Sequence, residues 1–249
     1  MIRLIFDGTF PGLLTALWIS CKKNYDTKAI ISIDIFSENF LYEDIFIETE
    51  NSIFELCYNA IQKKFSRNII QNFYNLFVSL ESKDSIDLLI YLKLLSHYGS
   101  NPDPLNSPQL IELRKRYDSM LKELHRWKGL MRFKKISNEI YYSNYIPSYP
   151  ITFLLSSHFS DRFPNSSLII NDSKRNEVAI YKNSNWEFTS FSKEVLNSLD
   201  NHEDNFEELF KVFHQNVSIK ERTSISRQMK FIPKKYWSCL PEMKGLSNR

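Results

Sequence analysis

The chain has few glycines and no glycine-rich motif. Only five glycines occur among its 249 residues, and neither GxGxxG nor GxxxxGK[ST] is present. Those motifs bring backbone N–H groups close to bound phosphates. Their absence argues against a dinucleotide-binding or P-loop nucleotide-binding protein.

Cysteine is also scarce, and its spacing matches no metal site. Cys21, Cys57 and Cys239 are far apart, with no CxxC, no zinc-type Cys/His cluster and no CxxxCxxC for an iron–sulfur cluster. We therefore expect no metal and no cofactor. Buried free thiols in a reducing cytoplasm are the expected state of the three cysteines.

Long apolar runs are missing too. No run approaches the ~20 residues that a membrane-spanning helix needs, and the N-terminus MIRLIFDGTF lacks the apolar core of a signal peptide. We expect a cytoplasmic protein with no membrane segment.

What the chain does contain is a globular composition with an uneven charge. Hydrophobic residues make up 43% and charged residues 24%, as in ordinary folded proteins. The net charge is only +3, but residues 1–110 carry 9 Lys/Arg and 13 Asp/Glu, whereas residues 111–249 carry 23 and 16. This asymmetry predicts a basic working surface in the second half.

The first half is expected to be acidic and mainly helical with a short β element. Residues 2–6 fit a buried strand, and residues 10–18 enter a helix after the turn Asp7-Gly8-Thr9. Two short extended pieces follow within residues 29–47. Three apolar stripes at helical spacing occupy residues 51–97, with Ser52 and Asp84 as expected N-caps.

A proline-rich break, GSNPDPLNSP, covers residues 99–108. It predicts one region from 1 to 100 and a basic α+β region from 101 to 249, although it also fits a loop inside one integrated domain.

The second half is expected to contain an antiparallel sheet of about five strands covered by helices, so that the fold class is α+β. The strand patterns lie at 130–136, 140–146, 167–171, 177–181 and 186–191. Helices are expected at 108–127, 151–159 and 205–216. In the last of these, the stripe Phe206, Leu209, Phe210 and Phe213 is expected to face the core.

Two basic stretches could bind phosphates. Residues 114–135 hold Arg114, Arg116, Arg126, Lys128 and Arg132 on an expected helix and the strand after it. An ordinary solvated helix with ion pairs is the alternative, and composition alone favours it.

Residues 220–241 place aromatic residues among cations, a mixture that suits nucleic acid. The cations include Arg222, Arg227, Lys230, Lys234 and Lys235. Tyr236 and Trp237 could stack on bases, or they could anchor the C-terminus while the lysines stay in solvent.

No catalytic signature is present. The chain lacks GxSxG, HExxH and any recognisable nuclease arrangement of carboxylates. His125 and His158 remain open as general bases, with Asp161 or Asp172 as partners. We expect His97, His202 and His214 to be structural.

Five stretches of the chain resemble a bacterial family of unknown function whose members are described as DNA repair or DNA metabolism proteins. They are FDGTFPGLLTAL, ELHRWKGLMRF, SSHFSDRFP, LIINDSKRNEVAIY and RQMKFIPKKYWSCLPE. The resemblance implies a companion radical SAM protein that modifies or repairs DNA, and a similar domain joined to uracil-DNA glycosylase-like domains. It supplies no agreed catalytic residues.

The resemblance adds Arg162 and Arg175 to the residues expected to bind nucleic acid. The leading hypothesis is a DNA-binding accessory protein in repair or base modification that acts with the radical SAM enzyme. The alternatives are a DNA-processing enzyme using His125 or His158 with Asp161 or Asp172, and a protein-interaction module without nucleic-acid contact.

Overall fold

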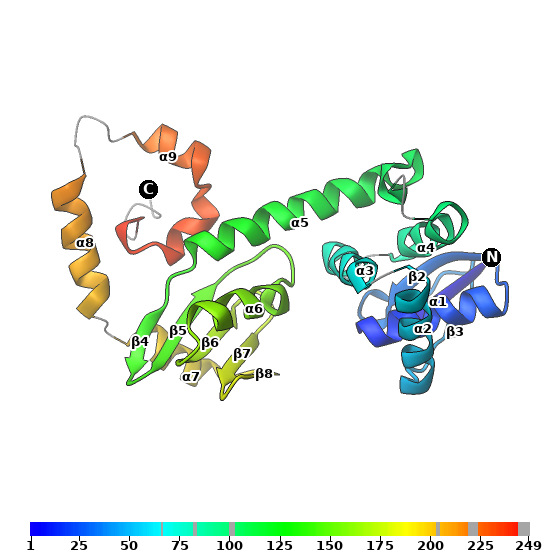
Figure 1. Ribbon diagram of the computed structural model, residues 1–249, viewed down its shortest axis with the longest axis horizontal. Helices are drawn as coiled ribbons and strands as arrows, with labels where there is room; N and C mark the ends of the chain where they lie inside the picture. Colours follow the sequence, from blue (N-terminus) through cyan, green and yellow to red (C-terminus); the bar gives the residue numbers. More distant parts are fainter. Residues whose placement is uncertain (66, 82–83, 100–102, 203–204, 219–223, 244–249) are drawn as a thin grey trace. The chain divides into compact units, whose positions relative to one another are not determined.

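The computed structural model describes residues 1–65, 67–81, 84–99, 103–202, 205–218 and 224–243. Two compact units divide the chain, unit 1 from Met1 to Leu121 and unit 2 from Lys122 to Arg249. The division predicted near residue 100 stays a prediction. Figure 1 labels the elements of both units.

Unit 1 contains a three-stranded parallel sheet. Its strands are β1 (Ile2–Phe6), β2 (Thr27–Ser32) and β3 (Glu43–Phe46), in the order β2-β1-β3. Both outer strands run parallel to β1. The sequence predicted only a short β element in this half. The sheet is larger than that prediction, because the two extended pieces expected within residues 29–47 both pair with the first strand. Parallel pairing requires a crossover, and helix α1 (Phe10–Lys22) lies between β1 and β2 in the chain.

The predicted DGT turn joins β1 to α1 through hydrogen bonds of Asp7. Its Oδ1 accepts from Thr9 N and Oγ1 at 2.9 and 2.7 Å, and its Oδ2 accepts from Thr49 Oγ1 at 2.7 Å. Burial alone would raise the pKa of the Asp7 carboxyl, but these hydrogen bonds outweigh it and the pKa lies below its usual value. Gly8 has φ +80°, and a Cβ there would lie 2.6 Å from Ser32 Oγ.

Helices α2 (Asn51–Lys64), α3 (Arg67–Ser79) and α4 (Ile86–Tyr98) occupy the region where three apolar stripes predicted helices. Their apolar faces share a core with α1 and β1 that includes Phe73, at 1% exposure. The expected N-caps were wrong, since Glu50 and Ser85 occupy the N-cap positions of α2 and α4, both without a side-chain cap hydrogen bond. Asp84 Oδ1 instead accepts from Ile86 N and Ile30 N, both at 2.9 Å, and so ties α4 to β2.

The proline-rich break forms two 3-10 turns, η2 (Pro104–Asn106) and η3 (Pro108–Leu110). Helix α5 (Ile111–Leu130) follows and continues from the last residues of unit 1 into unit 2. The predicted helix began three residues earlier, in the part that the structure shows as η3.

Unit 2 contains the expected five-stranded sheet, but one strand pair is parallel. The strands are β4 (Lys134–Ser137), β5 (Ile140–Tyr145), β6 (Ser167–Asp172), β7 (Glu177–Lys182) and β8 (Asn185–Thr189), in sequence order across the sheet. Three neighbouring pairs are antiparallel, whereas β5 and β6 run parallel. Helix α6 (Thr152–Arg162) connects β5 to β6, which is the crossover that a parallel pair needs.

Helices contact both faces of this sheet. Successive strand residues point to opposite faces, and on β5 Tyr145 OH lies 2.9 Å from Thr152 Oγ1 of α6. On the other face, Tyr142 OH donates to Asp200 Oδ1 at 3.0 Å. Asp200 ends helix α7 (Lys193–Asp200), which the sequence patterns did not predict. Figure 1 shows α6 lying against the sheet.

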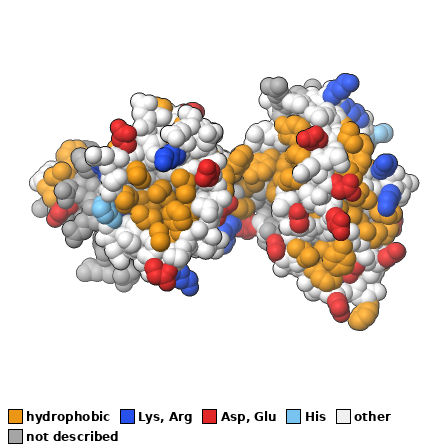
Figure 2. Space-filling model, turned by 90° about the horizontal axis from the view of Figure 1, so that it is seen from below, with side chains coloured by type: hydrophobic (Ala, Val, Ile, Leu, Met, Phe, Trp, Pro, Cys, Tyr) orange, Lys and Arg blue, Asp and Glu red, His pale blue; other side chains and the backbone are white. Residues whose placement is uncertain are grey.

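The C-terminal part of unit 2 is built from short helices. They are α8 (Asn205–Val217), α9 (Ile225–Phe231), η5 (Lys234–Cys239) and η6 (Pro241–Met243). The α8 stripe was expected to face the core, and this was wrong for Leu209, Phe210 and Phe213, which are 63%, 37% and 60% exposed. The side chain of Phe206 lies outside the described residues. Hydrophobic side chains gather on the surface of both units in Figure 2.

Two sequence expectations concern thiols and membranes. Cys57 is buried as expected, whereas Cys21 is exposed and Cys239 is half-buried. In the part of the chain that the structure describes, no helix is both long and apolar enough to cross a membrane.

Candidate nucleic-acid interface

A recess in unit 2 brings together two Arg–Phe pairs that are distant in sequence. Arg132 and Phe133 lie between α5 and β4, while Arg162 ends α6 and Phe163 follows it. The recess has a volume of about 170 Å³. It is lined by Gly129, Met131, Arg132, Phe133, Tyr141, Phe159, Arg162 and Phe163.

The aromatic lining of the recess is a connected set of rings. The ring of Phe133 lies 4.9 Å from that of Phe159 and 5.3 Å from that of Phe163, measured between centroids. Phe163 in turn lies 5.8 Å from Tyr141 of β5. Phe159 is buried, but Phe133, Tyr141 and Phe163 are partly exposed. The rings therefore form a wall that a flat ligand can reach.

The two guanidinium groups of the recess are exposed and carry uncompensated charge. Arg132 Nη1 donates to Gly129 O at 3.0 Å, which neutralises no charge. No described carboxylate forms an ion pair with Arg132 or Arg162. Guanidinium groups in this state attract phosphate and can bind it through two hydrogen bonds.

The C-terminal aromatic residues are anchors. Tyr236 and Trp237 are 0% and 1% exposed, so neither ring has a face open to a base in this structure. Tyr236 packs edge-on against Trp127 at 4.8 Å, and Trp237 Nε1 donates to Ile232 O at 2.8 Å. Of the two roles considered for these rings, the structure shows the anchoring one.

A buried carboxylate joins this C-terminal segment to α5. Glu123 is 3% exposed, and its Oε1 accepts from Trp127 Nε1 at 3.2 Å and from Ser148 N at 2.8 Å. The same oxygen pairs with Lys235 Nζ at 3.0 Å. Lys235 Nζ also lies 3.0 Å from Ser148 Oγ. Lys235 thus compensates a buried charge, so its role includes stabilisation of unit 2.

Other cations of the two basic stretches in unit 2 are exposed or half-buried. The guanidinium of Arg126 lies 5.9 Å from the ring centroid of Tyr236, on the exposed side of α5. Lys128 is half-buried, and three further cations that were predicted to bind nucleic acid are exposed. These three are Arg227, Lys230 and Lys234. Arg222, also predicted to bind nucleic acid, lies outside the described residues.

Arg175 and Asp172 stabilise a turn between β6 and β7. Arg175 Nη1 pairs with Asp172 Oδ2 at 2.9 Å, and its Nη2 donates to Ser148 O at 2.6 Å. Asp172 Oδ1 accepts from the backbone N of Lys174 and Arg175. Burial raises the pKa of the Asp172 carboxyl, although Arg175 opposes the shift. Both predicted site residues therefore already have structural partners.

Arg114 and Arg116 lie on the part of α5 that belongs to unit 1. Arg114 Nη1 donates to Asn106 Oδ1, and its Nε lies 4.0 Å from Asp118 Oδ2. Arg116 is half-buried. The ion pair of Arg114 matches the solvated-helix alternative for this stretch.

The predicted histidine and carboxylate candidates do not meet. His125 is exposed on α5, and Asp161 is exposed on α6. His158 Nε2 is buried and has no hydrogen-bond partner among the described residues, and its ring packs against Phe159 at 5.0 Å. No hydrogen bond or ion pair within the described ranges joins either histidine to Asp161 or Asp172. His214 has a side chain outside those ranges.

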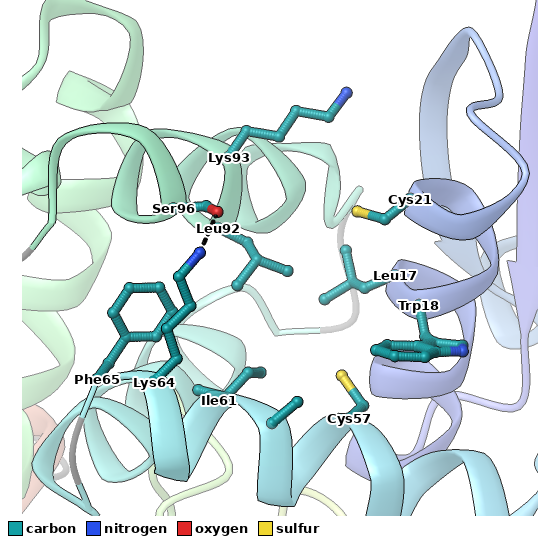
Figure 3. Close-up of a pocket in the computed structure, with 11 residues that line it drawn as sticks. Leu17, Trp18, Cys21, Cys57, Ile61, Lys64, Phe65, Leu92, Lys93 and Ser96 are labelled. Carbon is teal, nitrogen blue, oxygen red and sulfur yellow. Dashed lines mark hydrogen bonds between the residues drawn. The ribbon is translucent and has the colours of Figure 1, made fainter.

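Unit 1 has a second recess of about 250 Å³ with a mainly apolar lining (Figure 3). Leu17, Cys21 and Cys57 are among its lining residues, and Lys64 Nζ donates to Ser96 Oγ at 2.8 Å. Burial raises the pKa of the Cys57 thiol to about 12. Burial thus favours the protonated form of the Cys57 thiol, and no arginine is among the residues that line this recess.

The aromatic wall of the unit 2 recess was missed by sequence reasoning, and so was the role of Glu123. A signal for the wall was available, because both ELHRWKGLMRF and SSHFSDRFP contain an arginine directly followed by phenylalanine. The repetition alone does not place the two pairs together; the structure does, through the shared recess. Glu123 carried no such signal, since burial decides its role.

The fold and recess define a mixed α and β protein whose second unit exposes an arginine–aromatic site. A family model for the domain of unknown function DUF4130 matches residues 84–242, more than half of the chain. The chain belongs to this family. Four of the five resembling motifs lie within the match, and FDGTFPGLLTAL precedes it. No curated protein is significantly similar to the chain.

Replacing Glu123 with alanine is expected to destabilise unit 2. The change leaves Trp127 Nε1 and Ser148 N without their acceptor, at a cost of about 1–3 kcal/mol for each buried donor. Lys235→Ala should also destabilise unit 2, because it leaves the buried Glu123 carboxylate without its cation, but by less than Glu123→Ala, because the lysine side chain is 42% exposed and water can partly replace it. Guanidinium denaturation of the full chain measures both, with Glu187→Ala on exposed β8 as the control. Equal losses for Glu123→Ala and Glu187→Ala would contradict the role of Glu123.

Cys57 is expected to resist alkylation at pH 8, where a pKa of about 12 leaves about one thiol in ten thousand ionised. Exposed Cys21 should react with iodoacetamide first, and the rate at Cys57 should rise with pH because the thiolate is the nucleophile. Peptide mass spectrometry measures both sites, and denatured protein gives the reference rate. Labelling of Cys57 as fast as Cys21 in the folded protein would refute the assignment.

Proposed function

We propose that this protein binds DNA through unit 2 and serves as an accessory protein in DNA repair or base modification, acting with a radical SAM enzyme. The observation that carries the DNA part is the recess at Arg132 and Arg162. It combines two exposed guanidinium groups with reachable aromatic rings, and these are the groups that bind phosphates and bases.

Three further features support nucleic acid over other polyanions. Arg126 and Lys128 lie on the same unit without an ion pair to any described carboxylate. By the pairing of β4 with β5, Lys135 lies opposite Tyr141 of the recess and so projects from the same face. The resemblance set out from the sequence motifs is to proteins described in terms of DNA.

The DNA proposal predicts a salt-sensitive interaction that depends on the recess arginines. Arg132→Ala with Arg162→Ala should weaken oligonucleotide binding at least about tenfold at low salt. It should also reduce the magnitude of the slope of log affinity against log salt concentration by about 1.4–1.8. Each phosphate contact contributes about 0.7 to this slope on single strands and about 0.9 on duplex. Fluorescence anisotropy between about 50 and 200 mM salt measures both quantities.

A matched control removes two other cations from unit 2. Lys182 and Lys193 are exposed and have no described carboxylate partner, so Lys182→Ala with Lys193→Ala changes the net charge equally. If this control loses as much affinity as the arginine variant, binding is diffuse and the recess is not the interface. If the unmodified protein retains neither DNA nor RNA at low salt, the proposed function fails.

The radical SAM partner is supported by the resemblance and is tested separately. A tagged form of this chain, co-expressed with the radical SAM protein of the same genome, should retain it after nuclease treatment. Retention only before nuclease treatment would mean that DNA bridges the two proteins. No retention in either condition would remove the partner from the proposal and leave DNA binding standing.

A further inference from the structure

We infer that the recess at Arg132 and Arg162 holds a single unstacked nucleobase, so that the protein prefers single-stranded DNA or DNA with an unpaired base over intact duplex. The inference rests on the proposed DNA binding and adds the strand state that unit 2 recognises.

The size of the recess fits one flat ring system. Its volume is about 170 Å³. Drug-sized ligands occupy sites of about 300–1,000 Å³, so the recess is small for them. A nucleobase is flat, has two π faces, and is of the size that such a recess can enclose.

The lining of the recess fits a base better than it fits a phosphate. Phosphates are held by cations and N–H groups, and the aromatic wall of Phe133, Tyr141 and Phe163 adds nothing to that interaction. Every base, in contrast, can stack on an aromatic ring, whatever its sequence. The rings therefore indicate that more than the DNA backbone enters the recess.

The positions of the two arginines fit a nucleotide whose base is in the recess. In an intact duplex the bases are stacked inside and only phosphates and groove edges are exposed. A base that leaves the stack exposes its faces and edges, and its flanking phosphates remain outside. Arg132 and Arg162 both line the recess and both are exposed, so they can bind those phosphates while the rings hold the base.

Gly129 offers a way to block the recess without removing a cation. It lines the recess near the end of α5, and a Cβ placed there meets no heavy atom within 4 Å. Leucine is also a better helix former than glycine. Gly129→Leu is therefore expected to fold, and its larger side chain at the lining of the recess is expected to restrict access to it; Gly129→Ala is its matched control.

The experiment compares three probes that contain 2-aminopurine: a single strand, an intact duplex, and a duplex in which the 2-aminopurine is unpaired. The full-length protein should bind the first and third more tightly than the second, and only these two should change 2-aminopurine emission on binding. Gly129→Leu should abolish the emission change and weaken binding to these two probes about 5- to 150-fold, the range that loss of one stacked base gives. Gly129→Ala should leave affinity and emission nearly unchanged for all three probes. Gly129→Leu should change the affinity for the intact duplex little.

Two outcomes separate failure of this inference from failure of the proposed function. The first outcome is equal affinity for all three probes without an emission change, while salt sensitivity still depends on Arg132 and Arg162. This result overturns base binding and leaves DNA binding intact. No binding to any probe overturns both. The emission measured with the unmodified protein does not depend on the folding of any variant. Phe163→Leu, with exposed Phe188→Leu as its control, tests the ring wall independently.

Discussion

The buried carboxylate of Glu123 is the constraint on which the arrangement of unit 2 depends. A charge out of contact with water must be compensated by hydrogen bonds or an opposite charge. Glu123 obtains both, from an indole, a backbone N–H and the ammonium of Lys235. These donors come from α5, from the segment after β5 and from η5, so one carboxylate holds together three parts of the chain that are distant in sequence.

Aromatic residues in unit 2 therefore serve two purposes. Trp127 binds this carboxylate and packs against Tyr236, while Trp237 is buried among Leu240 and Met243; all three rings are buried and anchor the C-terminal segment. Phe133 and Phe163, by contrast, stay partly exposed beside guanidinium groups. The first set holds the C-terminal segment against α5, and the second set lines the recess for which base binding is proposed. A site that is formed before its ligand arrives lowers the entropic cost of binding.

Local patterns predicted most elements but not their pairing partners. Strand alternation in residues 140–146 and 167–171 located β5 and β6, yet their parallel direction depends on the crossover through α6, which only the folded chain shows. Periodicity likewise located α8, but it could not tell what covers Leu209 or Phe213. The basic stretch 114–135 pointed to Arg132 and the family resemblance pointed to Arg162, whereas Arg175, which the resemblance also indicated, is held by Asp172 in a turn. Burial, which separates these cases, is a property of the tertiary structure.

The family match and the compact units of the structure have different limits. The link between Asp84 and β2 crosses the start of the family match. The DUF4130 match begins at Asp84, but α4 packs its apolar side into the core of unit 1, with Leu88 and Leu95 fully covered. Asp84 itself accepts a hydrogen bond from Ile30 N. A fragment cut at the edge of the match would lose that bond and expose the apolar face of α4 to water. The limits of the family match therefore differ from the limits of the compact units of the structure.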